Sequence, residues 1–365
     1  MTFSPPWYLS QGLLMTLYTA WFAPQRAQKL LQSAEPAYQE HVFTGAGDVP
    51  IYGLYAIPPQ AKGTLLATYG ITGDLENQWF LRLLAQRAYE RGYGVIIFDW
   101  RGHGKTAQLS PTLTSDGLYE GEDFCYLAAQ AKRLGCGGPF WFAGYSLGGQ
   151  LALWGVYKAQ SLDQWGPDLD LTPQELGGGA VICPSLESEI SLKYLMAHPV
   201  GRYLEKAIAA NLKLLAYQLY TYHPQAFDLE IIEQANSIWA FDELLVIKRL
   251  GFDSVSDYYR ASSALPLLPQ LSRPTFLLYA QDDLLFSPLL IPPLRQASRD
   301  NPAITLHLTK HGGHVGYCSN ETVQHQYQDP DPWWAIHRLL DWLDEQSATL
   351  GSARESGPQL MANRL

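Results

Sequence analysis

The chain has 365 residues, 47% of them hydrophobic and 13% aromatic, so it can bury a large core and lacks the composition of a disordered protein. Its formal net charge is −10 and no cluster of lysine and arginine appears, which argues against a nucleic-acid partner and an anionic membrane surface. Four cysteines lie far apart without a C-x-x-C pair, so we expect reduced, buried thiols in a cytoplasmic protein.

Residues 1–35 are predicted to form an arm that packs on the main domain. Residues 1–25 carry no charged side chain, and the run Leu9–Phe22 is fairly apolar. The first basic residue is Arg26, too late for the positive start of a signal peptide. Prolines and polar residues bound the run too tightly for a transmembrane helix. Contact with a membrane surface is the less favoured alternative.

Strands and helices alternate between residues 36 and 184. The helical spacing predicts helices over Trp79–Arg91, Tyr119–Leu134 and Leu147–Ala159. The segment from Ser161 to Gly179 is predicted to be a surface loop. The predicted strands, the first two of which form a hairpin, are Glu40–Thr44, Ile51–Ile57, Thr64–Tyr69, Val95–Asp99, Phe140–Ala143 and Ala180–Cys183. This alternation is typical of a mostly parallel sheet with helices on both faces, an α/β fold.

Residues 185–265 interrupt the alternation. Leucines and tyrosines recur there at helical spacing over about eighty residues without a strand, which predicts a helical cap inserted over one end of the sheet. The core would then comprise residues 36–184 and 266–347, with strands Thr275–Tyr279 and Ala303–Leu308 and helices Pro288–Arg299 and Trp333–Glu345. Residues 348–365 are small and polar, so we expect a flexible tail.

The sequence Gly144-Tyr145-Ser146-Leu147-Gly148 has the pattern G-x-S-x-G between a predicted buried strand and a predicted helix. Small residues on both sides of a serine permit a sharp strand-to-helix turn that exposes the hydroxyl. The alternative is a glycine-rich turn with a capping serine.

A serine nucleophile needs a base, and that base needs an acid to orient it. One strand ends in Asp282-Asp283 and the next predicted strand is followed by His311 and His314, so each candidate follows the carboxyl end of a core strand. Glycines flank His314 and favour it over His311 as the base. A metal site built from these four side chains is an alternative, but no pair has the spacing of ligands on one helix.

The oxyanion formed by such a reaction needs two backbone donors. The N–H of Leu147 directly follows the serine, and Ile71 lies in the glycine-containing loop after the third strand, so these two are the predicted donors. An ordinary strand-to-helix turn is the alternative for the Ile71 loop. His103 lies between Arg101 and Gly104, and we expect this segment to fix a long loop rather than to act in catalysis.

The chain resembles the α/β-hydrolase superfamily, and more narrowly its YheT, ABHD1/ABHD3 and EMB8 type branch. The matching motifs are Tyr69–Gly73, Asp99-x-Arg101-Gly102-x-Gly104, Gly144–Gly149, Asp257-Tyr258-Tyr259-Arg260-x-Ser262-Ser263, Ala280-x-Asp282-Asp283 and Gly312-Gly313-His314-x-Gly316. Two positions depart from the pattern. Tyr69 stands where that branch usually has histidine, and Leu284-Leu285-Phe286 replaces its usual Pro-Phe.

The resemblance implies a serine hydrolase that cleaves carboxylic esters of short to medium or lipid-like acyl groups, with no cofactor. Ser146 would be the nucleophile, His314 the base and Asp283 its orienting acid, because the acid usually comes three residues after the small residue that closes the strand. Acyl transfer by the same residues, or a non-catalytic member of the fold that binds an apolar ligand, remain the alternatives.

Overall fold

The computed structural model describes residues 2–362, without the side chains of residues 32–34 and 351–362. Its centre is an eight-stranded sheet in the order β1-β2-β4-β3-β5-β6-β7-β8. Strand β2 runs antiparallel to both of its neighbours, β1 and β4, and strands β3 to β8 run parallel to one another. The strands are β1 Gln39–Thr44, β2 Pro50–Ala56, β3 Thr64–Thr68, β4 Gly94–Phe98, β5 Phe140–Tyr145, β6 Leu176–Ile182, β7 Thr275–Ala280 and β8 Ile304–Thr309.

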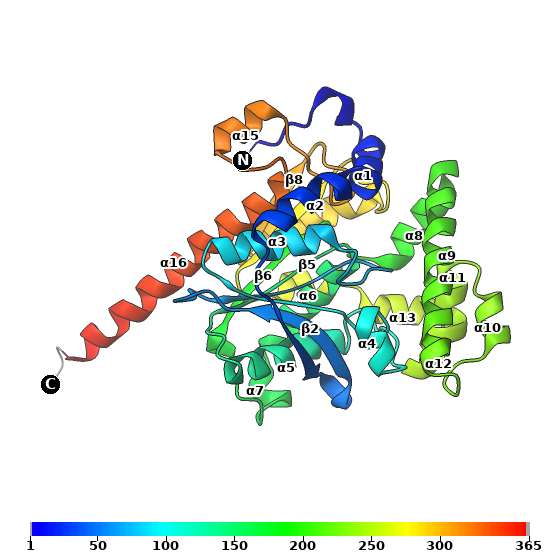
Figure 1. Ribbon diagram of the computed structural model, residues 1–365, viewed down its shortest axis with the longest axis horizontal. Coiled ribbons are helices and arrows are strands. Elements are labelled where there is room, and N and C mark those ends of the chain that lie inside the picture. The colour runs from blue at the N-terminus through cyan, green and yellow to red at the C-terminus, as the bar shows by residue number, and fades with distance from the viewer. Residues whose placement is uncertain (1, 363–365) are drawn as a thin grey trace.

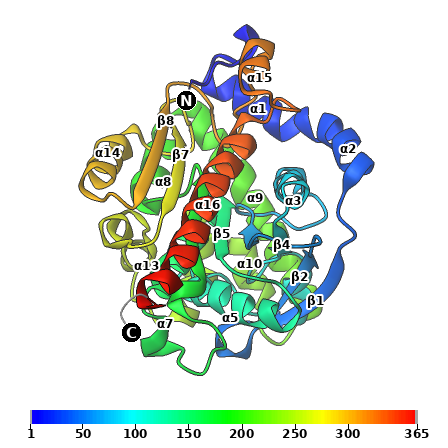
Figure 2. The ribbon, with the colours of Figure 1, turned by 90° about the vertical axis from the view of Figure 1, so that its left-hand side faces the viewer.

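Helices cover both faces of this sheet (Figure 1). Figure 2 shows α16 running across one face, with α3 beside it. The residues of the central strand β5 are almost all apolar because both of its faces are buried. Trp141 contacts Trp342 of α16, whereas the next residue, Phe142, contacts Phe124 of α5 on the opposite face. A strand buried on both faces needs apolar residues at every position, as the sequence predicts.

Several of the described helices lie in segments for which the sequence pattern predicts none. Examples are the short helix α4 after β4 and the helix α15 before α16. The α-helices are α1 Gly12–Trp21, α2 Ala23–Ala34, α3 Trp79–Glu90, α4 Gly104–Leu109, α5 Glu120–Arg133, α6 Leu147–Ala159, α7 Leu162–Trp165, α8 Ser188–Ala197, α9 Pro199–Tyr222, α10 Leu229–Gln234, α11 Ile238–Phe241, α12 Ile247–Leu250, α13 Val255–Ser262, α14 Ile291–Asp300, α15 Glu321–Tyr327 and α16 Trp334–Ala362.

The prediction of a surface loop up to Gly179 is wrong at its end. β6 begins at Leu176 and includes all three glycines, which are buried. A Cβ atom on Gly177 would lie 2.5 Å from Trp141, and one on Gly179 would lie 2.6 Å from Val156. Larger residues would therefore collide with the neighbouring strand and with α6, so glycine here reflects close packing and not a turn.

The predicted tail also begins inside a helix. α16 continues from Trp334 to Ala362, beyond the predicted end of the last core helix at Glu345. Residues 348–362 of the predicted flexible tail are therefore helical, residues 363–365 lie outside the described part of the chain, and the flexibility of this segment stays a prediction.

Helices α8 to α13 form the predicted insertion between β6 and β7, and no strand occurs between residues 185 and 265. Figure 1 shows them together at one side of the sheet. They have a hydrophobic cluster of their own, which includes Leu212, Leu215, Phe241 and Tyr258. Because the insertion follows β6 and returns into β7, it starts at the edge of the sheet where the parallel strands end.

The first two helices, α1 and α2, pack against the same domain, with α2 beside α3. Glu35 at the end of α2 accepts a hydrogen bond from Arg82 of α3 at 2.6 Å. All four cysteines are buried and unpaired, as expected. Among the described residues, no helix combines the length and the apolar character that crossing a membrane requires.

Candidate active site

Ser146 occupies a strained turn between β5 and α6, with φ 54° and ψ −128°. The motif needs its glycines because neighbouring backbone atoms pack closely around this turn. A Cβ atom on Gly144 would lie 2.2 Å from the carbonyl oxygen of Gly148, and one on Gly148 would lie 2.3 Å from that of Tyr69. A Cβ atom on Gly70 would approach the Cβ of Ser146 to 2.9 Å. The glycines therefore permit the sharp turn that places Ser146 at the end of β5.

His314 connects Ser146 to Asp283. Its Nε2 atom lies 2.9 Å from Ser146 Oγ and its Nδ1 atom lies 2.8 Å from Asp283 Oδ2. The Asp283 side chain is 2% exposed and that of His314 is 11% exposed. The three residues follow β5, β7 and β8, whose carboxyl ends meet at one edge of the sheet. A single imidazole thus contacts a hydroxyl with one nitrogen and a buried carboxylate with the other.

The two neighbouring aspartates face different groups. Asp283 Oδ1 accepts a hydrogen bond from the N–H of Leu285 at 2.9 Å, while Asp282 Oδ1 accepts one from the N–H of Gly313 at 2.9 Å. Asp282 Oδ2 lies 3.4 Å from Nδ1 of His311. His311 therefore faces Asp282 and not Ser146. Asp282 holds the backbone beside His314, and Asp283 contacts the ring.

The predicted oxyanion donors lie close to the serine: Leu147 directly follows it, and Gly70, the residue before Ile71, packs against its Cβ. Leu147 is the first residue of α6, and both Leu147 and Ile71 line the cavity that Ser146 opens into. Within the described residues, neither backbone N–H donates a hydrogen bond to another protein group. Both donors are thus free for a ligand oxygen, which is the condition an oxyanion site must meet.

His103 contacts the loop that carries Ile71. Its Nε2 atom accepts a hydrogen bond from the N–H of Thr72 at 3.1 Å, and its Nδ1 atom lies 3.1 Å from the carbonyl oxygen of Arg101. Burial lowers the pKa of His103 to about 4, so the ring is neutral, donates from Nδ1 and accepts at Nε2. Thr72 has a positive φ of 61°, which such a bond stabilises.

Asp99 holds the same loop from its other end. Its Oδ1 atom accepts hydrogen bonds from the hydroxyl of Tyr69 at 2.5 Å and from the N–H of Leu75 at 2.9 Å, while Oδ2 accepts one from the N–H of Lys105 at 2.8 Å. Burial raises the pKa of Asp99 to about 6. Tyr69, the departure noted in the sequence, is therefore a donor to a buried carboxylate.

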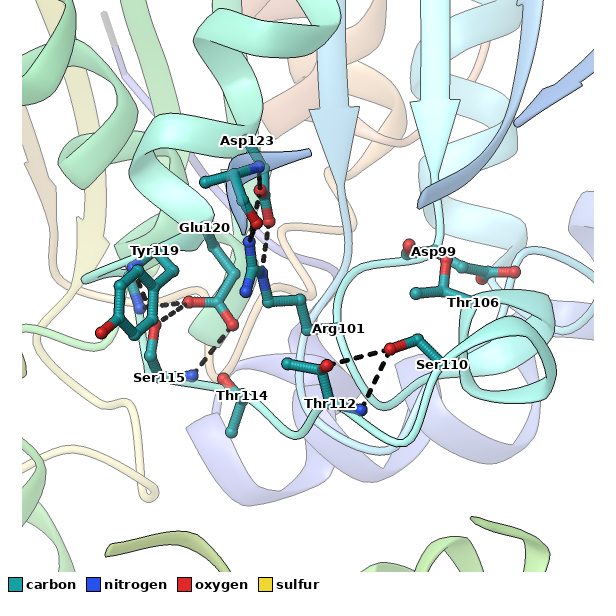
Figure 3. A network of polar contacts seen from close by, with 12 residues as sticks. Asp99, Arg101, Thr106, Ser110, Thr112, Thr114, Ser115, Tyr119, Glu120 and Asp123 are labelled. Atoms are coloured by element: carbon teal, nitrogen blue, oxygen red, sulfur yellow. Dashed lines mark hydrogen bonds and ion pairs between the residues drawn. The ribbon is translucent and has the colours of Figure 1, made fainter. Parts of the chain in front are cut away.

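The segment that carries Asp99 and His103 is itself fixed by a buried ion pair (Figure 3). Arg101 Nε donates to Asp123 Oδ2 at 2.7 Å and Nη2 donates to Oδ1 at 2.8 Å, in the bidentate geometry that guanidinium favours. Nη2 also donates to the carbonyl oxygen of Ala46 at 2.6 Å. The expectation that this motif fixes a long loop agrees with these contacts.

The cavity beside Ser146 extends under the helical insertion. Its walls are mainly apolar and come from both the core and the insertion: Ile71, Leu113, Leu192, Leu195, Ile208, Leu212, Leu215, Ile238, Phe241, Leu285 and Phe286. Leu285 and Phe286 are part of the second departure from the family pattern, and they form part of this wall. Cavities of this kind bind apolar groups through shape and burial.

Two carboxylic acids, Asp116 and Asp242, interrupt this apolar wall. Burial raises the pKa of Asp116 to about 7, and burial together with the nearby Asp116 raises that of Asp242 well above its usual range. The hydroxyl of Tyr259 donates a hydrogen bond to Asp242. Asp116 lies on the loop before α5 and Asp242 in the insertion, and nothing in the local sequence pattern indicates that these two acids lie near each other.

A metal at the site is disfavoured by the chemistry of the side chains. Cys183, Asp283 and His314 offer ligand atoms within 4.8 Å of one another. Burial raises the pKa of the Cys183 thiol, which opposes the thiolate that a metal would need, and both nitrogens of His314 already contact protein groups.

Comparison with known proteins places the chain in a family. Residues 72–325 match the family described as "Alpha/beta hydrolase family". The chain is 59% identical over 350 residues to a Synechocystis protein named "Putative esterase slr0264", which covers 94% of this chain and 95% of that protein. It is 26% identical over 286 residues to "Putative esterase YheT" of Escherichia coli, covering 78% of this chain and 77% of that protein.

More distant relatives agree with this placement. The chain is 27% identical over 263 residues to mouse phospholipase ABHD3, covering 72% of this chain and 60% of that protein. The solved structure of the Pyrococcus furiosus esterase PF2001 has a TM-score of 0.55 at 16% identity, covering 86% of this chain and 93% of that one, which shows the shared fold. The chain therefore belongs to the α/β hydrolase family and is an esterase-like member of the branch that includes YheT and ABHD3.

Proposed function

We propose that this protein hydrolyses carboxylic esters through an acyl-enzyme, with Ser146, His314 and Asp283 as a catalytic triad. The observation that carries the proposal is the His314 ring, which lies within hydrogen-bond distance of Ser146 Oγ on one side and of Asp283 Oδ2 on the other. A serine, an imidazole and a buried carboxylate in this order are the groups that activate a hydroxyl for acyl transfer.

In the first half of the reaction, Ser146 Oγ attacks the ester carbonyl and His314 Nε2 takes the hydroxyl proton. The backbone N–H groups of Leu147 and Ile71 stabilise the negative oxygen of the tetrahedral intermediate. Collapse breaks the bond to the alcohol, which leaves with the proton from Nε2, and the acyl group stays on Ser146. Asp283 keeps the proton on Nδ1 throughout and stabilises the transient imidazolium.

In the second half, water attacks the acyl carbonyl while His314 Nε2 takes one of its protons. The second tetrahedral intermediate releases the carboxylic acid, and Ser146 regains its proton. Neither half requires a cofactor. The same groups would transfer the acyl chain to an alcohol that replaced water, so the products of the reaction distinguish hydrolysis from acyl transfer.

We further propose that helices α8 to α13, residues 185–265, act as a cap that holds the acyl chain. The apolar side chains of α8, α9 and α11 line the cavity that contains Ser146, which supports an apolar acyl group of short to medium length or a lipid-like ester. The relatives named as esterases and as a phospholipase agree with this substrate class.

The test is hydrolysis of p-nitrophenyl esters of graded acyl length by the wild type and by Ser146→Ala in parallel. We expect activity in the wild type and a loss on the order of 10⁶-fold in kcat in the variant, together with loss of covalent labelling by a fluorophosphonate. A wild type that neither turns over any ester nor reacts with the probe would indicate a ligand-binding member of the fold.

A further inference from the structure

Helix α1 presents an apolar stripe to solvent. Leu14, Leu17, Tyr18 and Trp21 recur at the spacing of one helix face, and of these Leu14 and Trp21 are exposed, Trp21 by 58%. Phe22, the next residue, is 62% exposed, and Trp7 in the preceding turn is 86% exposed. The predicted arm therefore packs on the core with one side only. Large apolar side chains that share an exposed helix face mark interaction surfaces.

The opposite side of α1 lies on the loops that hold the proposed catalytic residues. Met15 is fully buried against Gly316, and a Cβ atom on Gly12 would lie 1.9 Å from the carbonyl oxygen of Asp282. Thr16 Oγ1 accepts a hydrogen bond from the N–H of His314 at 2.8 Å. The exposed stripe is thus fixed to the edge of the sheet where the cavity lies, so whatever binds it lies beside the active site.

The charges of the chain indicate what kind of surface the stripe on α1 can bind. Residues 2–25 contain no charged side chain, although the whole chain has a net charge of −10. An anionic bilayer would repel a protein of this net charge. The stripe contains no lysine or arginine of its own, and the two cations of the arm, Arg26, which contacts the Tyr18 ring, and Lys29, lie on α2. Tryptophan and tyrosine favour the boundary between lipid chains and headgroups, and an amphipathic helix rests there without crossing. An uncharged or zwitterionic lipid surface matches these properties.

From this stripe we infer that the N-terminal arm, residues 2–35, docks the protein on a zwitterionic lipid–water interface. Trp7, Leu14, Trp21 and Phe22 enter the headgroup region. Docking in this orientation brings the carboxyl edge of the sheet, with Ser146 and the apolar cavity, next to lipid. The inference concerns binding and stands independently of the proposed ester hydrolysis.

The experiment measures co-sedimentation with dioleoylphosphatidylcholine vesicles, using full-length Ser146→Ala protein so that the result does not depend on catalysis. We expect this protein to bind, and the added substitutions Trp7→Ala, Trp21→Ala and Phe22→Ala to weaken partitioning by at least about tenfold, since each removes a large apolar contact. The control is Tyr222→Ala, which removes a half-exposed aromatic side chain from the last residue of α9, in the insertion, and should leave partitioning unchanged.

Trp7→Ala alone guards against misfolding of the combined variant, because so exposed a side chain contributes little to the fold. It should weaken partitioning several-fold with an unchanged thermal melt. The inference is overturned if the parent protein does not bind these vesicles, if the combined variant binds equally, or if binding requires anionic lipid. Sedimentation velocity without lipid tests whether a second copy of the chain covers the stripe instead. A dimer that dissociates in the substituted variants would assign the stripe to this contact and overturn the inference.

Discussion

Replacement of Asp283 by asparagine gives the sharpest test of the proposed triad. The new side chain can still accept the hydrogen bond from the N–H of Leu285 through its amide oxygen. Its NH₂ group then faces Nδ1 of His314, where the carboxylate of Asp283 lies at 2.8 Å in the wild type. Because an NH₂ group donates, the ring must accept at Nδ1 and carry its proton on Nε2. That proton points at Ser146, and the imidazole can no longer take the proton of the hydroxyl.

The expected effect is a loss of about 10⁴-fold in kcat, which corresponds to roughly 5.5 kcal/mol of transition-state stabilisation. Stability should change little, because the volume and one hydrogen bond are kept and burial of a charge is removed. Asp282→Asn is a matched control one residue away. Its side-chain oxygen can still accept from the N–H of Gly313, so it loses mainly its attraction to His311, about 1 kcal/mol, and kcat should stay within a few-fold.

Both variants are compared by steady-state hydrolysis of a short p-nitrophenyl ester, with thermal melts to confirm folding. A collapse of kcat in Asp282→Asn with Asp283→Asn nearly active would refute the assignment of the acid. Equal losses in the two variants would show that the loops move together, and would remove the distinction between ring contact and backbone contact on which the prediction rests.

Three further predictions concern the surroundings of the triad. Tyr69→Phe removes the donor to Asp99 and should lower kcat about tenfold or more with little change in KM, measured by steady-state kinetics; an unchanged kcat would contradict a role in holding the oxyanion loop. Leu212→Ala combined with Leu215→Ala should shift preference toward longer acyl chains, and an unchanged chain-length profile in a folded variant would count against the cap as acyl pocket. Asp116 has a folded pKa of about 7, above the ordinary aspartate value of 3.8, so its contribution to stability is full below about pH 4 and is lost as pH rises through 7. Thermal melts should therefore show that Asp116→Asn gains stability relative to the wild type between about pH 4 and pH 7, and a difference independent of pH would disprove it.

Local sequence patterns predict most of the core because each buried strand is a short run of apolar residues that can be recognised in the sequence. Val95–Asp99 and Thr275–Tyr279 are apolar at nearly every position, and the structure places β4 and β7 within one residue of them. The pattern fails at Gly177–Gly179, because glycine is typical of turns. Only the position of Trp141 on the next strand shows that these residues need to be small.

The candidate site likewise has residues that the sequence predicts and supporting contacts that it does not. Ser146, His314 and Asp283 each follow a recognisable strand, so their meeting at one edge follows from the parallel sheet. The contacts that hold them do not follow from any local pattern. Thr16 and His314 are 298 positions apart, and the bond between His103 and Thr72 joins two separate loops. A threonine and a histidine acting as acceptors for backbone N–H groups leave no signature in their neighbouring residues.

These supporting contacts also explain the departure at Tyr69. The loops around the serine are held mainly through backbone N–H groups that donate to buried acceptors, and Asp99 receives two such bonds and the tyrosine hydroxyl. In this chain the residue before Gly70 supplies a donor to Asp99. A histidine, usual at this position in the branch that the chain resembles, can offer a ring N–H, and tyrosine offers an O–H from a longer ring. In this chain the Tyr69 hydroxyl donates to Asp99, so the change of residue type keeps a donor beside the loop that carries the proposed oxyanion donor Ile71.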